Sequence, residues 1–482
     1  MGKIILHFGA VDQIAEVYIN KVFVGKHVGG YLPFSFDITK HLYLDKPNLI
    51  CVIVTDNLDK TLPYGKQRKN RGGMWYTPIS GIWQTVWLES VPQNFISEIK
   101  LTPSGNTIKI ETTGGDEQKT IKIDLLPFLN TTYVGDNITL TIPNPIFWSP
   151  QNPHLYRFSI TSGQDTIYSY FALRDISYKT INNVNYICLN NQPIFLNALL
   201  DQGYFPDGIY LPSTPQGYVN DILTAKKFGF NTLRKHIKIE PLLFYYYCDL
   251  YGILVMQDMV NNGKYNFLTD TALPTIGFKT KLGFGASKKQ KEQFINDSKA
   301  TLKLLHNSPC VIYYTIFNEG WGQFDADKVY TQLKQLDSTR VFDATSGWFE
   351  KTKSDVNSKH VYFKPLKLKA NGAKPLILSE FGGYSYKIQN HSFNLKKTYG
   401  YKKITSSKDF EKEIFNLYIE QVIPCINNGL NGAVLTQISD VEDETNGLLT
   451  YDRKVEKISA EKMQEINNQI YTAFFNATKI HN

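Results

Sequence analysis

Cysteine is scarce in this chain of 482 residues, and the five cysteines are scattered and odd in number. Such a set does not suit the paired framework that holds small secreted domains together. We expect free thiols, most of them buried inside apolar runs. They stand at positions 51, 188, 248, 310 and 425.

Long apolar runs are also missing. The sequence contains no hydrophobic N-terminal stretch and no transmembrane span, and Leu6 stands where a myristoylation signal needs a hydroxyl residue. We therefore expect a cytoplasmic protein without a membrane partner. A secreted form stays open as the alternative, because an incomplete N-terminus would lack its signal peptide.

The chain has no large excess of charge of one sign, since 52 Lys and Arg stand against 44 Asp and Glu. This dispersed charge does not indicate a nucleic-acid partner. The densest basic stretch, residues 359–374, predicts a solvated loop, with an anion site for acidic substrates as the alternative. Clusters with metal-ligand spacing are absent as well, so we predict that no metal or other cofactor is essential.

Apolar and aromatic residues are well represented. A hydrophobic content of 42% is enough for several separate cores in a chain of this length. Aromatic residues reach 13%, and flat rings can stack on the apolar face of a sugar, although most of them are expected to pack in cores.

Short apolar runs alternate with helical patterns over the last 300 or so residues, which predicts a (β/α)8 barrel. Eight runs predict strands at residues 193–200, 230–233, 253–259, 311–317, 341–344, 359–363, 375–379 and 432–437. Apolar residues at three- and four-residue spacing predict helices at residues 217–228, 240–251, 288–306, 325–336, 408–428 and 459–475.

Two glutamates follow such runs directly. Glu319 comes after the fourth predicted strand and Glu380 after the seventh, and glycines follow both. The carboxyl ends of barrel strands carry catalytic groups, and retaining glycoside hydrolysis needs two carboxyl groups about 5–5.5 Å apart. A single carboxylate at a strand end is more often a cap or an ion-pair partner, but the pair in this setting favours a glycosidase.

Several motifs resemble glycoside hydrolase family 2, which includes β-galactosidases, β-glucuronidases and β-mannosidases. Residues 8–12, 17–20, 29–34 and 80–84 are similar to the jelly-roll signatures of that family, and residues 147–156 and 171–174 to its immunoglobulin-like domain. Asn318-Glu319 matches the acid/base motif and Glu380 the nucleophile. The resemblance implies a multidomain protein with a jelly roll at 1–92, an immunoglobulin-like β-sandwich at 93–178 and a catalytic barrel at 179–482.

The jelly roll departs from the family pattern, because Met1 stands only seven residues before Phe8 where the family has further strands. We therefore expect an incomplete sandwich with an open edge. A second copy of the chain, another partner or the barrel itself is expected to cover that edge.

The resemblance also implies roles for individual residues. Glu319 must carry a proton at neutral pH to act as the acid, beside the apolar Trp321, and Glu380 must stay ionised to attack the sugar. Asn318 is expected to bind the sugar 2-hydroxyl. Arg234 and Tyr362 are expected to support the nucleophile, with a buried ion pair and a core ring as their alternative roles.

Four further residues are weaker candidates. Asp201 could hold sugar hydroxyls, and Trp348 or Tyr204 could close the sugar site, because residues 436–440 lack the tryptophan that well-known members carry there. His236 lies one residue nearer to Arg234 than in the common pattern of the family. A cap or core histidine is its alternative role.

The resemblance implies a retaining, exo-acting β-glycosidase that acts on a carbohydrate. The glucuronidases of the family carry an Asn-x-Lys pair that grips the sugar carboxylate, and here Asn446 lacks that lysine. This favours a β-galactosidase-like enzyme over a glucuronidase. A β-glucosidase, β-mannosidase or β-glucuronidase specificity, and a non-catalytic carbohydrate-binding or scaffolding relative, are the alternatives.

Overall fold

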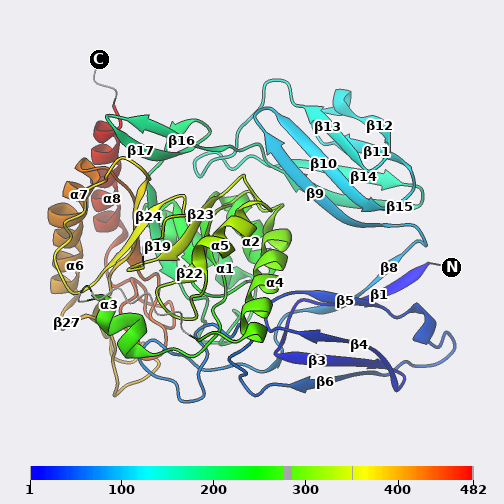
Figure 1. The fold of residues 1–482 in the computed structure, drawn as a ribbon, viewed down its shortest axis with the longest axis horizontal. Helices are drawn as coiled ribbons and strands as arrows, with labels where there is room; N and C mark the ends of the chain where they lie inside the picture. The colour runs from blue at the N-terminus through cyan, green and yellow to red at the C-terminus, as the bar shows by residue number, and fades with distance from the viewer. Residues whose placement is uncertain (1, 276, 278–284, 350, 480–482) are drawn as a thin grey trace. The chain divides into compact units, whose positions relative to one another are not determined.

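The computed structural model describes residues 2–275, 277, 285–349 and 351–479, so the predicted start at Met1 lies outside the described residues. The chain divides into two compact units (Figure 1). The first comprises Met1–Asp59, Ser80–Asp175 and Ala300–Pro309. The second comprises Lys60–Ile79, Ile176–Lys299 and Cys310–Asn482.

The N-terminal part of the first unit is built from short antiparallel strands. One sheet has the order β5-β1-β8 and another the order β4-β3-β6. Burial alternates along β3, because successive side chains of a strand point to opposite faces. These strands are β1 (Lys3–Phe8), β3 (Ile14–Ile19), β4 (Val22–Val28), β5 (Phe34–Asp37), β6 (Ile50–Thr55) and β8 (Val86–Val91).

A second pair of antiparallel sheets follows, with the orders β13-β10-β9 and β12-β11-β14-β15. Buried residues of both sheets, such as Ile110 and Ile160, form one hydrophobic core, as expected of a β-sandwich. The strands are β9 (Ile96–Ser104), β10 (Thr107–Gly114), β11 (Gln118–Ile123), β12 (Thr131–Val134), β13 (Asn137–Thr141), β14 (Tyr156–Ser162) and β15 (Asp165–Phe171).

The second unit contains a parallel sheet with the order β23-β22-β21-β20-β19-β28-β25-β24, and it forms the barrel (Figure 1). Every residue of β22 and of β25 is buried, which explains the unbroken apolar runs in their sequences. The strands are β19 (Leu196–Asp201), β20 (Thr232–Lys235), β21 (Leu254–Asp258), β22 (Val311–Asn318), β23 (Val341–Ser346), β24 (Asn357–Val361), β25 (Leu376–Gly382) and β28 (Leu430–Thr436).

Helices alternate with these strands, as the spacing of apolar residues predicts. The predicted helix at residues 408–428 is divided into α6, a π-helical segment (Leu417–Val422) and α7. The helices are α1 (Gln216–Lys227), α2 (Leu242–Tyr251), α4 (Lys288–Leu305), α5 (Ala326–Lys334), α6 (Ser407–Asn416), α7 (Ile423–Asn427) and α8 (Ala460–Ala477). The predicted fold class, β-sandwiches followed by an eight-stranded parallel barrel, is confirmed.

Two smaller expectations can be checked directly. Four of the five cysteines are buried free thiols, but Cys51 is exposed, because it lies on a face of β6 whose residues are largely open to solvent. Among the described residues, no helix combines the length and the apolar character that crossing a membrane requires.

Residues 60–79 belong to the second unit, although they lie in the sequence between β6 and β7 (Gly81–Ile82) of the first unit. The Tyr64 hydroxyl donates a hydrogen bond to the carbonyl of Gly263, and the Tyr76 hydroxyl donates one to Glu444. This segment therefore supplies side chains to the carboxyl-terminal end of the barrel.

Candidate active site

Glu380 lies on β25 and has three close neighbours from other strands. Its Oε1 accepts a hydrogen bond of 3.0 Å from Arg234 Nη1, and its Oε2 accepts one of 2.7 Å from the Tyr362 hydroxyl. His360 Nδ1 lies 3.5 Å from the same Oε2. The side chain of Glu380 is only 7% exposed, so protein groups make up nearly all of its surroundings.

Arg234, at the end of β20, is a fully buried hub of this network. It pairs with Asp258 through Nε and Nη2 at 3.0 and 2.9 Å. It also donates to the Ser379 carbonyl and to Asn318 Oδ1. A buried guanidinium is tolerable only when its donors meet such acceptors, and here they hold it in one orientation.

The electrostatics keep Glu380 ionised. Burial alone would raise the pKa of Glu380, but His360 and Arg234 outweigh burial and hold the pKa well below its usual range. Burial raises the pKa of the Tyr362 phenol far above its ordinary value, so Tyr362 remains a hydrogen-bond donor. A buried carboxylate in this state is suited to act as a nucleophile.

Glu319 follows directly after β22 and has a different setting. Its backbone has a φ of 56°, in the left-handed region that non-glycine residues rarely adopt. Its amide donates to the Ser346 carbonyl at 3.0 Å, which fixes the turn. Its carboxyl oxygen Oε1 forms a hydrogen bond of 2.9 Å with His360 Nδ1. The side chain is 14% exposed.

The two glutamates lie close together. One carboxylate oxygen from each, together with His360 Nδ1, all fall within 4.8 Å of one another. Oxygens this close favour the retaining arrangement, because inverting glycosidases hold their carboxyl groups about 6.5–9.5 Å apart to leave room for a water molecule.

The same three groups could also hold a metal ion by spacing alone. A metal bound there would occupy the lone pairs that both carboxylates need for acid/base and nucleophilic chemistry. We therefore treat the three side chains as neighbours in one candidate active site.

Asn318 is the last residue of β22 and precedes Glu319. Its Oδ1 accepts hydrogen bonds from Arg234 Nη2 at 3.0 Å and from Ser346 Oγ at 2.7 Å. Because these bonds fix the carbonyl side of the amide, the NH2 group is the part left to donate to a ligand.

His236 joins the network through a second carboxylate. Its Nδ1 lies 2.7 Å from Asp258 Oδ2, and Asp258 is also the partner of Arg234. Burial lowers the pKa of His236 to about 4 against the effect of Asp258, so the imidazole is neutral near pH 7. His236 therefore belongs to the site, although it stands one residue nearer to Arg234 than in the common pattern of the family.

Asp201 and Tyr204 lie in a neighbouring cluster. Asp201 pairs with Lys235 at 2.6 Å and accepts from the amide of Gly203, and both charged side chains are buried. The ring of Tyr204 packs edge-on against Tyr76, at a centroid distance of 4.8 Å. Their described contacts are with the protein, so a direct role in sugar binding stays a prediction for both.

Trp321, two residues after Glu319, packs in a cluster of aromatic rings. Its ring meets Trp75 and Tyr64 at centroid distances of 5.0 and 5.4 Å, both edge to face. Its indole N–H donates to the Gly263 carbonyl at 3.0 Å. Two of the three rings come from residues 60–79, so this segment supports the turn that carries the acid/base candidate.

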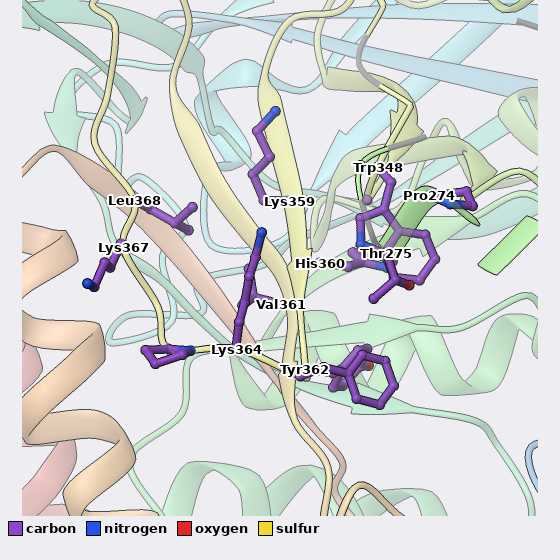
Figure 2. A pocket seen from close by; sticks show the side chains of 14 residues that line it. Pro274, Thr275, Trp348, Lys359, His360, Val361, Tyr362, Lys364, Lys367 and Leu368 are labelled. Carbon is purple, nitrogen blue, oxygen red and sulfur yellow. The ribbon is translucent and has the colours of Figure 1, made fainter. Parts of the chain in front are cut away.

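Trp348 follows β23 and borders a cavity of about 800 Å³ that also reaches His360 and Tyr362 (Figure 2). The Trp348 and His360 rings meet edge to face at 5.7 Å. Lys359 and Lys364, from the basic stretch of the sequence, line the same cavity. The cavity is linked to the two glutamates through His360 and Tyr362, which line it and contact them.

The structure thus brings Glu319, Glu380, Asn318, Arg234, Tyr362 and His236 into one network. Sequence reasoning missed His360 and Asp258. Their signals were weak, because His360 lies two residues before Tyr362 on a predicted strand and Asp258 ends a strand like many other carboxylates. It also missed residues 60–79, whose position depends on contacts far apart in the chain.

Family comparisons agree with this geometry. The chain matches the sugar-binding domain of glycosyl hydrolases family 2 over residues 1–92, a second domain of that family over 93–174, and its TIM barrel domain over 214–470. The protein belongs to glycosyl hydrolases family 2.

Individual relatives are distant. A β-galactosidase of Thermoanaerobacter pseudethanolicus is 25% identical over 81% of the chain and 53% of its own length. A β-galactosidase of Priestia megaterium is 23% identical over 81% of the chain and 40% of its own length. The chain therefore spans about half or less of the length of these relatives.

Solved structures share the fold at low identity. A β-D-glucuronidase of Dictyoglomus thermophilum has a TM-score of 0.76 at 17% identity, covering 97% of this chain and 86% of that one. A β-galacturonidase from Eisenbergiella tayi has a TM-score of 0.68 at 18% identity, covering 97% and 87%. These likenesses concern the fold alone.

Proposed function

We propose that the protein is a retaining, exo-acting β-glycosidase in which Glu380 is the nucleophile and Glu319 the acid/base. The observation that carries this proposal is the unequal setting of two carboxyl groups that lie within 4.8 Å of each other. Glu380 is held ionised by fixed donors, whereas Glu319 has one imidazole contact and some access to solvent.

In the first step, Glu380 attacks the anomeric carbon while Glu319 gives its proton to the departing oxygen. The bond from the anomeric carbon to that oxygen breaks, and an ester bond to Glu380 forms. In the second step, Glu319 takes a proton from water, the water oxygen attacks the anomeric carbon, and Glu380 leaves as a carboxylate. Two inversions restore the β-configuration.

Asn318 and Tyr362 support these steps. The NH2 group of Asn318 donates to the sugar 2-hydroxyl, an interaction that strengthens as the sugar ring develops positive charge. Tyr362 keeps the nucleophile ionised and aimed before attack. Trp348 forms one wall of the cavity beside them, where an indole can stack on an apolar sugar face (Figure 2).

For the sugar, we propose a β-galactoside. The similarity to two β-galactosidases and the missing lysine after Asn446 support this choice over a β-glucuronide. Distinguishing a galactoside from a glucoside takes a few placed donors to one hydroxyl group.

A panel of 4-nitrophenyl β-glycosides tests both the reaction and the sugar. It should include the galactoside, glucoside, mannoside, glucuronide and galacturonide, with the product anomer followed by NMR. We expect release from the galactoside with the β-anomer formed first. Release from none of the sugars at any pH would support the non-catalytic carbohydrate-binding alternative, and an initial α-anomer would contradict retention.

The same panel addresses the predicted absence of an essential metal. Activity after dialysis against a chelator should equal that of the untreated enzyme. Complete loss, restored by a divalent metal, would instead assign the Glu319–His360–Glu380 group to a metal centre.

A further inference from the structure

His360 lies between the two catalytic candidates. Its Nδ1 is 2.9 Å from Glu319 Oε1 and 3.5 Å from Glu380 Oε2. The β24–β25 ladder pairs His360 directly with Glu380, so neighbouring strands fix this position. The imidazole is fully buried, with the Trp348 ring against it and no room for a side chain at Gly347, where an added Cβ would lie 3.0 Å from Nδ1.

The surroundings of the ring define where its proton sits. Carboxyl oxygens accept hydrogen bonds, and Nδ1 lies between one oxygen of Glu319 and one of Glu380. The other ring nitrogen, Nε2, is buried without a hydrogen-bond partner among the described residues. Nδ1 is therefore the ring nitrogen whose proton faces the two carboxyl groups.

The two oxygens of Glu380 differ in how firmly their donors are held. Oε1 is bound by Arg234, which four other groups hold in place. Oε2 is bound by Tyr362 and faced by His360, and each of these donors has a second acceptor within reach. For Tyr362 it is Thr436 Oγ1 at 2.9 Å, and for His360 it is Glu319 Oε1.

We propose that His360 is a positioning residue whose Nδ1–H follows the negative charge of the site from Glu380 to Glu319. In the resting enzyme Glu319 carries the acid proton, and the N–H lies between Glu319 Oε1 and the ionised Oε2 of Glu380. When Glu380 Oε2 attacks the anomeric carbon, its charge is lost, and Glu319 becomes a carboxylate as it protonates the leaving oxygen. The N–H then donates to Glu319.

The proton on Nδ1 never leaves the ring in this scheme. The only proton transferred is the one that passes from Glu319 to the leaving oxygen and is later replaced from water. Tyr362 and His360 can turn to Thr436 and Glu319 when Oε2 loses its charge. We therefore assign Oε2 as the attacking oxygen, because its reaction leaves neither donor unsatisfied. Oε1 stays with Arg234 throughout.

The inference rests on the proposed glycosidase function, and a leaving-group comparison tests it separately. His360→Asn keeps an N–H near the position of Nδ1, and His360→Leu is close to it in size but has no donor. For the sugar that the wild-type enzyme cleaves, kcat/KM is measured with phenol and with 2,4-dinitrophenol as leaving groups. Thermal unfolding of each variant is recorded alongside.

Phenol requires protonation as it departs, so its release leaves the new charge on Glu319. We expect His360→Leu to lose about 10- to 100-fold in kcat/KM with the phenyl glycoside, the range for a hydrogen bond to a charged group. With the dinitrophenyl glycoside the loss should be within about threefold, because that group departs with little protonation. His360→Asn should recover most of the phenyl activity.

Equal losses with both leaving groups, or no difference between the Asn and Leu variants, would overturn the inference while leaving the glycosidase itself established. An inactive wild-type enzyme would instead overturn the proposed function. His154→Leu, in the β-sandwich, is the control for loss of a histidine. If His360→Leu does not fold, His360→Ala replaces it in the same comparison.

Discussion

The end of β25 and the end of β22 each carry one glutamate, yet they are built in opposite ways. At β25, Glu380 lies inside the strand, with Arg234 and Tyr362 donating to it. At β22, Glu319 follows the strand in left-handed backbone, and its carboxyl group meets the imidazole of His360.

This difference corresponds to what each group must do. A nucleophile has to stay ionised and aimed, and donors held by the fold achieve that. An acid/base has to lose and regain a proton in each cycle, and many fixed donors would stabilise only its charged form. The proposed nucleophile has several donors held by the fold, whereas the proposed acid/base has fewer of them among the described residues.

Removing the nucleophile should have the largest effect. Glu380→Ala is expected to lose more than the roughly 10²–10⁴-fold that a general acid or base contributes, because no attacking group remains. Turnover of the substrate found in the panel measures this loss. With added azide, the product should be a glycosyl azide of inverted anomeric configuration, and a retained product would mean that the two roles are exchanged.

Arg234→Met should come next, because it removes the donor that the fold holds on Glu380 and leaves Asp258 without its cationic partner. Breaking a buried ion pair costs about 3–5 kcal/mol, so the free energy of unfolding should fall by that order together with activity. Chemical denaturation and kcat/KM measure the two effects.

Arg340 is the matched control for Arg234, since it is equally buried and pairs with Asp337 just before β23 begins. Arg340→Met should destabilise the protein by a similar amount and leave the activity of the folded fraction intact. Similar activity losses in both variants would show that Arg234 acts through stability alone.

Removing the acid/base should have an effect that depends on the substrate. Glu319→Ala is expected to lose about 10²–10⁴-fold with a phenyl glycoside and far less with a dinitrophenyl glycoside. Azide should now give the retained glycosyl azide, since it can replace water as the second nucleophile. An equal loss with both leaving groups would contradict the role of Glu319.

Tyr362→Phe should change activity least, and its effect should appear in the pH dependence of kcat/KM. Attack needs the ionised form of Glu380, so activity falls as the pH drops through the pKa of Glu380. Loss of the Tyr362 donor should raise this pKa from its lowered value and move the acid limb of kcat/KM upward by about one pH unit.

Tyr313 is the control for Tyr362, because its hydroxyl donates to Asp343, another buried carboxyl group. Tyr313→Phe should leave the acid limb where it is. A shift of the same size in both variants would show that the acid limb of kcat/KM does not follow the pKa of Glu380.

The regular parts of this structure follow from local patterns in the sequence. A strand buried on both faces has an unbroken apolar sequence, so β22 and β25 could be placed, and with them Glu319 and Glu380. Arg234 and Tyr362 were expected from the resemblance to the family, and both stand at or just after a strand end.

Other parts depend on contacts between distant segments. The apolar and aromatic residues of 60–79 have no strand or helix period that would indicate a place beside Trp321. His360 is separated from Glu319 by 41 positions, and only the strand order of the barrel brings the two together. Residue patterns within one segment carry no information on such pairs.

The most direct test of the central claim is to trap the glycosyl-enzyme. The enzyme is treated with a 2-deoxy-2-fluoro glycosyl fluoride of the sugar that it cleaves, digested, and analysed by mass spectrometry. The account predicts one sugar per chain, on the peptide that contains Glu380. A label on Glu319, or turnover without any covalent adduct, would contradict it.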